Sequence, residues 1–174
     1  MHTGPMDITI RPARHEEFEE IGELLVAAYA ADGLLALGAD DPYVHELRKV
    51  AERAEQAEVL TAVDADGTVL GAVTFAAPGS PYAEIAGPDE GEFRMLAVAP
   101  AGRGRGIGEA LVRACMDRAR SLGLTRMVLS ALPHIENAHR VYQRIGFTRI
   151  PERDWEPVPG ITLLAFTCDL GEAV

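Results

Sequence analysis

The feature that most constrains this fold is the stretch AGRGRGIGEAL, residues 101–111. Glycine stands at every second position from Gly102 to Gly108, Arg103 and Arg105 lie between the glycines, and an apolar helical pattern follows at once. Glycines leave backbone amides open to a ligand, and a helix N-terminus adds unpaired donors and a positive dipole end. The pattern predicts a strand–turn–helix unit whose turn binds phosphate. The alternative is a flexible turn whose arginines offset an acidic surface.

The periodicity around this turn predicts a mixed sheet flanked by helices. Short runs that precede helical patterns, and then alternate with them, are typical of this α/β (α+β) class. The expected strands are residues 7–11, two arms of a hairpin around Asp66-Gly67, 92–98, 126–132, 147–150 and 161–170. The expected helices are residues 18–29, 44–54, 106–122 and 138–145, and residues 78–91 are expected to form a Pro/Gly loop. Because ligands favour the carboxyl ends of strands that lead into helices, the glycine turn is the expected site.

Composition narrows the choice of partners. At 174 residues with 48% hydrophobic side chains, we expect a single domain over residues 1–174, with residues 1–6 flexible. The formal net charge of −11 argues against nucleic acid and anionic membranes as partners, because both are anions, and it favours a cationic partner such as an amine. No basic and apolar leader or long apolar span is present, so we expect a cytoplasmic protein.

The two cysteines, Cys115 and Cys168, lie in apolar settings without metal-ligand spacing. We therefore expect buried free thiols, no metal and no cysteine nucleophile.

Two common phosphate motifs do not fit the glycine turn. A Walker loop needs Lys-Ser or Lys-Thr after its last glycine, but Gly108 is followed by Glu109. The dinucleotide fingerprint needs a third glycine where this chain has Ile107 or Glu109.

What fits is Arg103-x-x-Gly106-x-Gly108 after the strand EFRMLAVAP. This resembles the pyrophosphate loop of the GCN5-related N-acetyltransferases, the GNAT superfamily. AHRVYQRIGF, residues 138–147, is similar to the second family motif, Ala-x-x-x-Tyr-x-x-x-Gly-Phe. The likeness extends over nearly the whole chain, from ITIRPA to the last strand.

The resemblance implies a largely antiparallel sheet of about six or seven strands with about four helices, and a V-shaped splay between the two strands after the hairpin. It also implies acetyl-coenzyme A as acyl donor. The exposed backbone of one splayed strand would pair with the pantetheine arm, an N–H near Val98 would stabilise the oxyanion, and the glycine turn would hold the pyrophosphate. The residues so implied are Leu96, Ala97, Val98, Arg103, Gly104, Arg105, Gly106, Ile107 and Gly108.

Acetylation of an amine needs a base and an acid. An alkyl ammonium has a pKa of about 10.4, so a base that removes its proton is useful at neutral pH. Glu92 matches the position of a family carboxylate base. His134, a water molecule, or a merely solvated Glu92 are the alternatives. Tyr142 matches the family tyrosine that protonates the leaving thiolate, although its spacing also fits core packing.

One position departs from the family pattern. Many relatives have an asparagine that contacts pantetheine seven residues before that tyrosine, but this chain has Ile135 there. Asn137 falls two residues too late, so the role is not transferred to it.

The acceptor is much less readable than the donor. The family places it near the early helices, the Pro/Gly loop and the segment before the last strand, here with Asp32 and Glu156 beside the four main candidates, Tyr29, Tyr82, Asp154 and Trp155. Acidic and aromatic side chains suit an amine by charge pairing and cation–π contact. Trp155 fits equally well as an anchor of its loop on the sheet.

We therefore expect direct acetyl transfer to a small-molecule or peptide amine in a ternary complex. The alternative is an acyl-coenzyme A sensor without turnover. The sequence does not determine the acceptor or the use of other acyl groups. An exposed last strand would allow a homodimer.

Overall fold

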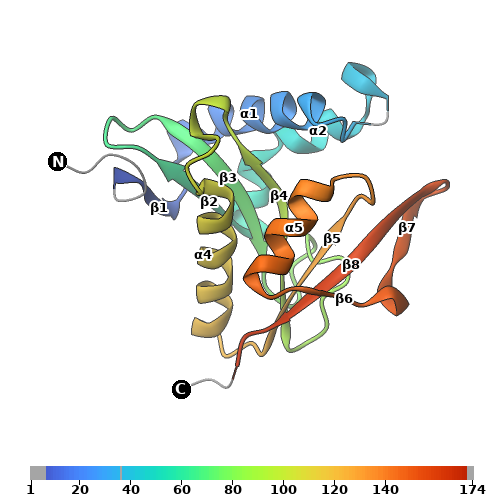
Figure 1. The fold of residues 1–174 in the computed structure, drawn as a ribbon. Coiled ribbons are helices and arrows are strands. Elements are labelled where there is room, and N and C mark those ends of the chain that lie inside the picture. Colours follow the sequence, from blue (N-terminus) through green and yellow to red (C-terminus); the bar gives the residue numbers. More distant parts are fainter. Residues whose placement is uncertain (1–6, 36, 172–174) are drawn as a thin grey trace. The chain divides into compact units, whose positions relative to one another are not determined.

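The computed structural model describes residues 7–35 and 37–171, so the predicted flexible segment 1–6 lies outside the described residues. The chain forms two compact units. The first comprises residues 1–75 and 95–114, and the second comprises residues 76–94 and 115–174. Strand β4 (Glu90–Val98) and helix α4 (Ile107–Ser121), both labelled in Figure 1, each begin in one unit and end in the other.

The strands of the first unit form an antiparallel ladder. β1 (Thr9–Pro12) pairs with β2 (Glu58–Val63), and β2 pairs with β3 (Val69–Ala76). The predicted hairpin around Asp66-Gly67 is confirmed. Its turn is closed by Asp64, whose Oδ1 accepts the N–H groups of Asp66 and Thr68, each at 2.9 Å. The carboxylate thereby stabilises a five-residue connection without further packing.

The helices of the first unit supply its apolar core. α1 (Phe18–Ala31) follows a short 3₁₀ turn at His15–Glu17, and a second 3₁₀ turn covers Gly38–Asp40. The core joins α1 to the helices that follow and to the strands, with Ile21, Leu25, Leu47, Val50, Val59, Ala72 and Ala97 among its buried residues.

The expectation of one helix over residues 44–54 is wrong. The structure has α2 (Tyr43–Arg48) and α3 (Val50–Gln56), separated at Lys49, which has φ −82° and ψ 54°. Arg53 is buried, and its guanidinium donates to the carbonyls of Glu46 and Leu47 at the end of α2. The Glu46 carbonyl also accepts the Lys49 N–H at 3.2 Å, in a tight last turn, and the arginine adds a donor to both carbonyls where the helix ends, which stabilises the break.

The second unit contains β5 (Arg126–Ala131), β6 (Thr148–Arg149), β7 (Trp155–Val158) and β8 (Ile161–Asp169). Its strands follow the order β4-β5-β8-β6, and β7 pairs with β8 as a hairpin (Figure 1). Helix α5 (Glu136–Ile145) supplies Tyr142 to an aromatic cluster with Phe93, Phe147 and Phe166, whose ring centroids lie 5.8–6.1 Å from that of Tyr142. Two 3₁₀ turns cover Pro100–Gly102, in the first unit, and Pro151–Arg153, in the second.

The predicted α/β class with a mixed, largely antiparallel sheet is confirmed, with eight strands and five α-helices among the described residues. β4 and β5 pair in parallel, whereas the pairs β1–β2, β2–β3, β5–β8, β6–β8 and β7–β8 are antiparallel. The parallel register covers Glu90–Glu92 against Arg126–Val128 and then ends, as expected for strands that separate. The extra helix comes from the break at Lys49, and the extra strand is the short β7, whereas β6 lies within the strand expected at residues 147–150.

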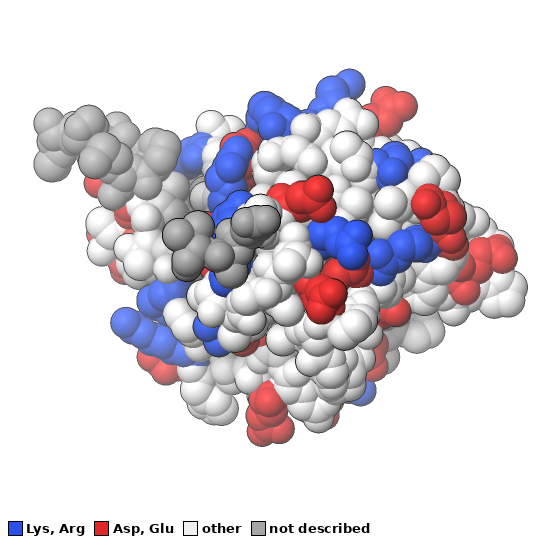
Figure 2. All heavy atoms as spheres, turned by 90° about the horizontal axis from the view of Figure 1, so that it is seen from below, with Lys and Arg blue, Asp and Glu red and all other residues white. Residues whose placement is uncertain are grey.

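The surface carries both charges despite the net charge of −11, and Figure 2 shows basic and acidic side chains beside one another over the face that it draws. Within residues 7–35 and 37–171, no helix is both long and apolar enough to cross a membrane. Both cysteines are buried free thiols, as predicted.

Candidate active site

The glycine turn of the first unit divides its glycines by function. Gly104 and Gly106 have φ of 76° and 74°, a conformation that other residues rarely adopt, and their Cα atoms face open space. Gly102 instead serves packing, because a Cβ there would lie 2.8 Å from Ile107 Cδ1 and 3.0 Å from the Leu70 carbonyl oxygen. The turn is therefore held closely at its start and is open where it enters α4.

The backbone of this turn presents a run of open donors. The first helical hydrogen bond of α4 runs from the Ala110 N–H to the Gly106 carbonyl at 3.0 Å. In the part of the chain that the structure describes, the amides of residues 104–108 donate to no protein acceptor. Unpaired amides at the positive end of a 15-residue helix are a suitable environment for an anion.

The arginines of the turn differ in their surroundings. Arg103 is exposed and lies 3.9 Å from the equally exposed Asp32. Arg105 is half-buried. Val98, at the end of β4, packs beside Gly102 and Gly108, so the structure brings this strand end and the turn together within the first unit.

Met95, within β4, has a backbone conformation that the sequence does not predict. It is the one non-glycine residue with positive φ in the described chain, at 56°, although it is buried in the core. Such a backbone conformation costs free energy in a bulky residue and persists only where packing determines it. It separates Glu92, which pairs with β5, from the predicted pantetheine-binding residues 96–98.

Glu92 is a buried carboxylate with two unlike oxygens. Its exposure is 0%, so the alternative of a solvated glutamate is wrong. Oε1 accepts three main-chain N–H groups, from Glu84, Ile85 and Ala86, at 2.8, 2.9 and 3.1 Å. Oε2 is buried and has no partner among the described residues. Burial raises the pKa of Glu92 above its usual range, although the three N–H groups lower it.

The predicted Pro/Gly loop spans residues 77–89, because β4 already begins at Glu90, and further ion pairs hold it. Arg94 donates to the Tyr82 carbonyl at 3.3 Å and lies 3.1 Å from a Glu84 carboxylate oxygen. Arg153, from the 3₁₀ turn before β7, donates to the Ile85 carbonyl and to Glu90. This ion pair holds the pKa of Glu90 below its usual range.

Tyr142 lies in the aromatic cluster of the second unit and is 7% exposed. Burial raises its pKa to about 12, so the phenol stays protonated at neutral pH. Its ring centroid lies 5.8 Å from that of Phe93, the neighbour of Glu92 in β4. The structure thus gives Tyr142 the core packing that its spacing predicts, together with a protonated hydroxyl.

The predicted acceptor residues are mostly engaged within the protein. The Tyr29 ring lies 5.9 Å from that of Tyr43, and Tyr82 belongs to the clamped loop. Asp154 pairs with Arg149 and accepts the Ala165 N–H at 2.8 Å. Trp155 donates to Ser130 Oγ on β5 at 3.0 Å, the bond that an anchoring role predicts. The rival base His134 lies on an exposed turn.

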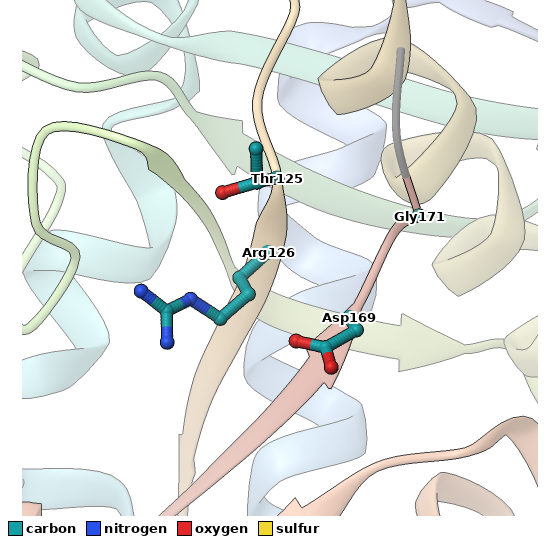
Figure 3. Close-up of a pocket in the computed structure, with 4 residues that line it drawn as sticks. All are labelled: Thr125, Arg126, Asp169 and Gly171. Carbon is teal, nitrogen blue, oxygen red and sulfur yellow. The ribbon is translucent and has the colours of Figure 1, made fainter. Parts of the chain in front are cut away.

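The second unit also has a pocket of about 350 Å³ lined by Thr125, Arg126, Asp169 and Gly171, none of which the sequence singles out (Figure 3). Figure 3 shows the side chains of Arg126 and Asp169 extending from neighbouring strands. Across residues 7–35 and 37–171, no cluster of three or more His, Cys, Asp or Glu residues suits a metal ion.

Comparison with known proteins decides the family. The model of the acetyltransferase (GNAT) family matches residues 18–147, more than half of the 174-residue chain. The chain belongs to the GNAT family. The match includes both motifs on which the sequence resemblance rests and also the carboxylate and tyrosine described above.

The relatives agree with this membership. An uncharacterized N-acetyltransferase of Schizosaccharomyces pombe is 27% identical over 163 residues, covering 92% of this chain and 94% of the relative. A GCN5-related N-acetyltransferase of Kribbella flavida is 25% identical with a TM-score of 0.68, covering 95% and 99% of the two chains. A GNAT superfamily phosphinothricin acetyltransferase of Sinorhizobium meliloti, solved with acetyl-coenzyme A, is 20% identical with a TM-score of 0.71, covering 97% of this chain and 91% of that one. GNAT membership therefore supports acetyltransferase activity.

Sequence reasoning missed three residues of this region. Glu90 and Arg153 bind the loop, and Met95 has a positive φ within β4. An acidic pair at 90 and 92 beside a Pro/Gly loop is a weak signal for such a role, and nothing in the sequence marks Arg153 or Met95.

Proposed function

We propose that this protein is an acetyl-coenzyme A dependent N-acetyltransferase that transfers acetyl directly to a primary amine. The observation that carries the proposal is the run of open amides at residues 104–108, in the place where the family motif binds pyrophosphate. The open space at Gly104 and Gly106 suits a diphosphate, since no side chain blocks the amides.

In this proposal the first unit binds and orients the donor. The amides of residues 104–108 and the guanidinium groups of Arg103 and Arg105 hold the diphosphate. The backbone of Leu96, Ala97 and Val98 pairs with the pantetheine arm. An N–H near Val98 stabilises the negative charge that develops on the carbonyl oxygen, an effect worth several kcal/mol when donors are preorganised. When bound, acetyl-coenzyme A supplies the acetyl group as an activated thioester.

Glu92 and Tyr142 carry out the proton transfers in this proposal. Glu92 Oε2 accepts a proton from the acceptor ammonium, directly or through water, and its raised pKa makes it a stronger base than an ordinary carboxylate. Tyr142, whose buried phenol is protonated at neutral pH, donates its proton to the departing thiolate. Both cysteines are buried, which favours direct transfer over a covalent intermediate.

The acceptor in this proposal is a small-molecule or peptide amine, with Tyr29, Tyr82, Asp154 and Trp155 as predicted contacts. Asp154 and Trp155 form hydrogen bonds within the protein, so in this proposal they contact the amine as fixed side chains that do not rearrange on binding. The single-domain organisation, the cytoplasmic location and self-association stay predictions.

A thiol-release assay with acetyl-coenzyme A and a panel of primary amines tests the proposal. We expect coenzyme A release that depends on one class of amine, together with acetylated product by mass spectrometry. Acetyl-coenzyme A binding without turnover across the panel would favour a sensor, and absence of binding would contradict both functions.

A further inference from the structure

Ile85, in the middle of the Pro/Gly loop, is bonded on both sides of its main chain. Its N–H donates to Glu92 Oε1 at 2.9 Å, and its carbonyl accepts from the Arg153 guanidinium. The neighbouring N–H groups of Glu84 and Ala86 bind the same Glu92 oxygen. A segment without regular secondary structure is thus held by two charged side chains.

The ion pair of Arg153 closes this arrangement into a ring. Arg153 Nη1 and Nη2 lie 3.1 and 2.8 Å from the two carboxylate oxygens of Glu90, and Glu90 Oε1 accepts the Gly87 N–H at 2.9 Å. Glu90 is only 4% exposed. We call Glu90, Glu92 and Arg153, with the main chain of residues 84–87, the loop clamp.

We propose that Arg153 is a positioning residue for amine acetylation, which acts by fixing residues 84–87 so that main-chain amides hold Oε1 of Glu92 and leave Oε2 without a partner among the described residues. The catalytic consequence rests on the proposed function, in which that second oxygen accepts the acceptor's proton. The structural part, that Arg153 orders the loop, stands independently of it.

The composition of the loop explains why an arginine is needed. Residues 77–89 include Pro78, Gly79, Pro81 and Pro88, and a proline donates no main-chain hydrogen bond. The loop has isolated turn bonds, such as that from the Ser80 N–H to the Ala77 carbonyl at 3.0 Å, but it is not part of a strand ladder, so side-chain contacts add to what holds it. A guanidinium has a planar fork of donors that suits a carbonyl and both oxygens of a carboxylate at once. Without Arg153, the Ile85 carbonyl loses this donor, and the buried carboxylate of Glu90 keeps the Gly87 N–H at 2.9 Å and Arg126 at 3.4 Å.

The test uses the full chain with Arg153→Gln, Arg153→Lys and Glu90→Gln, and with Arg120→Gln as the matched control. Arg120 also lies in the second unit and makes the same kinds of bond, to the Leu170 carbonyl at 3.1 Å and to Asp117 at 3.0 Å, but it does not bind the loop. Hydrogen exchange of the amides of Glu84, Ile85 and Ala86 reports loop order, and isothermal titration reports acetyl-coenzyme A affinity.

We expect Arg153→Gln to speed exchange of these three amides at least about tenfold and to lower kcat/KM for the best amine of the panel at least about tenfold. Acetyl-coenzyme A affinity should stay within about twofold, and Arg120→Gln should change neither readout. Arg153→Lys should give a smaller effect, because it keeps the charge and loses the fork, and the double variant Arg153→Gln/Glu90→Gln should add little to the larger single effect.

Exchange at residues 84–86 that is unchanged in Arg153→Gln, or in Arg153→Lys if the glutamine variant does not fold, would overturn the proposal. Faster exchange with unchanged kcat/KM would overturn its catalytic part. If the wild-type protein acetylates no amine, the proposed function fails, and the exchange result alone decides whether Arg153 orders the loop.

Discussion

The glycine turn at residues 103–108 and the Pro/Gly loop at residues 77–89 are both irregular and glycine-containing, but they treat their polar groups in opposite ways. The turn keeps five consecutive amides, those of residues 104–108, without an acceptor among the described residues. The loop gives three consecutive amides to one carboxylate oxygen and a carbonyl to an arginine. A turn that must bind a ligand leaves donors open, whereas a loop that must keep one shape uses them internally.

This difference separates two tasks of one proposed enzyme. Open amides and absent side chains suit a ligand that brings its own negative charge. Closed amides suit a buried glutamate, because they stabilise its carboxylate without using the second oxygen. We therefore expect substitutions in the turn to affect ligand binding and substitutions at Glu92 to affect turnover and stability.

The largest expected effect is on the open turn. Gly106→Glu should weaken acetyl-coenzyme A binding at least about 100-fold by isothermal titration, because it places a carboxylate beside the amides and repels the phosphates. Gly33→Glu is the matched control, since Gly33 also has positive φ, 70° against 74°, and open surroundings in the same unit. Equal loss of binding in both variants would assign the effect to backbone strain.

The next effect is on the closed loop. Glu92→Gln keeps an oxygen for the three amides but removes the base, so turnover should fall about 100-fold while the loop stays ordered. Glu92→Ala should also lower the free energy of unfolding by about 2–4 kcal/mol, because it removes a buried side chain and the acceptor of three part-buried main-chain N–H groups. Turnover and urea unfolding measure the two effects. Full activity of Glu92→Gln would point to His134 or water as the base.

The pH dependence of the wild-type rate sharpens the same prediction. The base must be deprotonated, so kcat/KM should rise with pH through the pKa of Glu92, which burial raises above that of an ordinary carboxylate. The glutamine variant should lose this limb. A rate limb that persists in Glu92→Gln would belong to another group.

A smaller effect on turnover is expected at Tyr142, whose ring is packed in the aromatic cluster and whose hydroxyl is the proposed acid. Tyr142→Phe keeps the ring contacts with Phe93, Phe147 and Phe166 and removes only the acid. Turnover should fall about tenfold or more, with acetyl-coenzyme A affinity unchanged. Equal turnover in both proteins would leave Tyr142 as a core residue.

The smallest effect concerns a closed carboxylate of the first unit. Glu17 binds Arg11 through two hydrogen bonds of 2.9 and 2.7 Å and accepts the Arg14 N–H, and its pKa falls to about 2, chiefly through the bond from Arg11. Since the folded-state pKa lies below the unfolded value of about 4.3, this stabilisation is present above pH 4.3 and is lost as the pH falls towards 2.

Urea unfolding of Glu17→Gln measures this stabilisation. At pH 7 the variant should lose about 1–3 kcal/mol, and the difference from wild type should shrink as the pH falls towards 2. Glu23→Gln breaks an exposed pair with Arg48 and should change stability by less than about 1 kcal/mol. Similar losses in both variants would contradict the special role of Glu17.

The open turn could be predicted from the sequence because its chemistry is local. Gly104 and Gly106 are needed for their own backbone conformation, and the strand and helix beside them have clear periodicity. The α/β class follows from the same periodicity. The break at Lys49 could not be predicted, because the apolar spacing of Val44, Leu47, Val50 and Ala54 is continuous and a buried Arg53 stabilises the interruption.

The closed loop could not be predicted because its bonds join residues far apart in the chain. Glu92 could be named from the family motif, but its two unlike oxygens depend on the amides of Glu84, Ile85 and Ala86. Arg153 meets Ile85 across 68 positions, and no periodicity relates them. The predicted acceptor residues Asp154 and Trp155 show the same limit, since their partners Arg149, Ala165 and Ser130 are set by the folded sheet.

The most direct test of the central claim is amide chemical-shift mapping of the wild-type protein during titration with acetyl-coenzyme A. We expect saturable binding with the largest shifts among residues 104–108 and small shifts at the amides of Glu84, Ile85 and Ala86, which donate to Glu92. Absence of binding, or binding that leaves residues 104–108 unshifted, would contradict it.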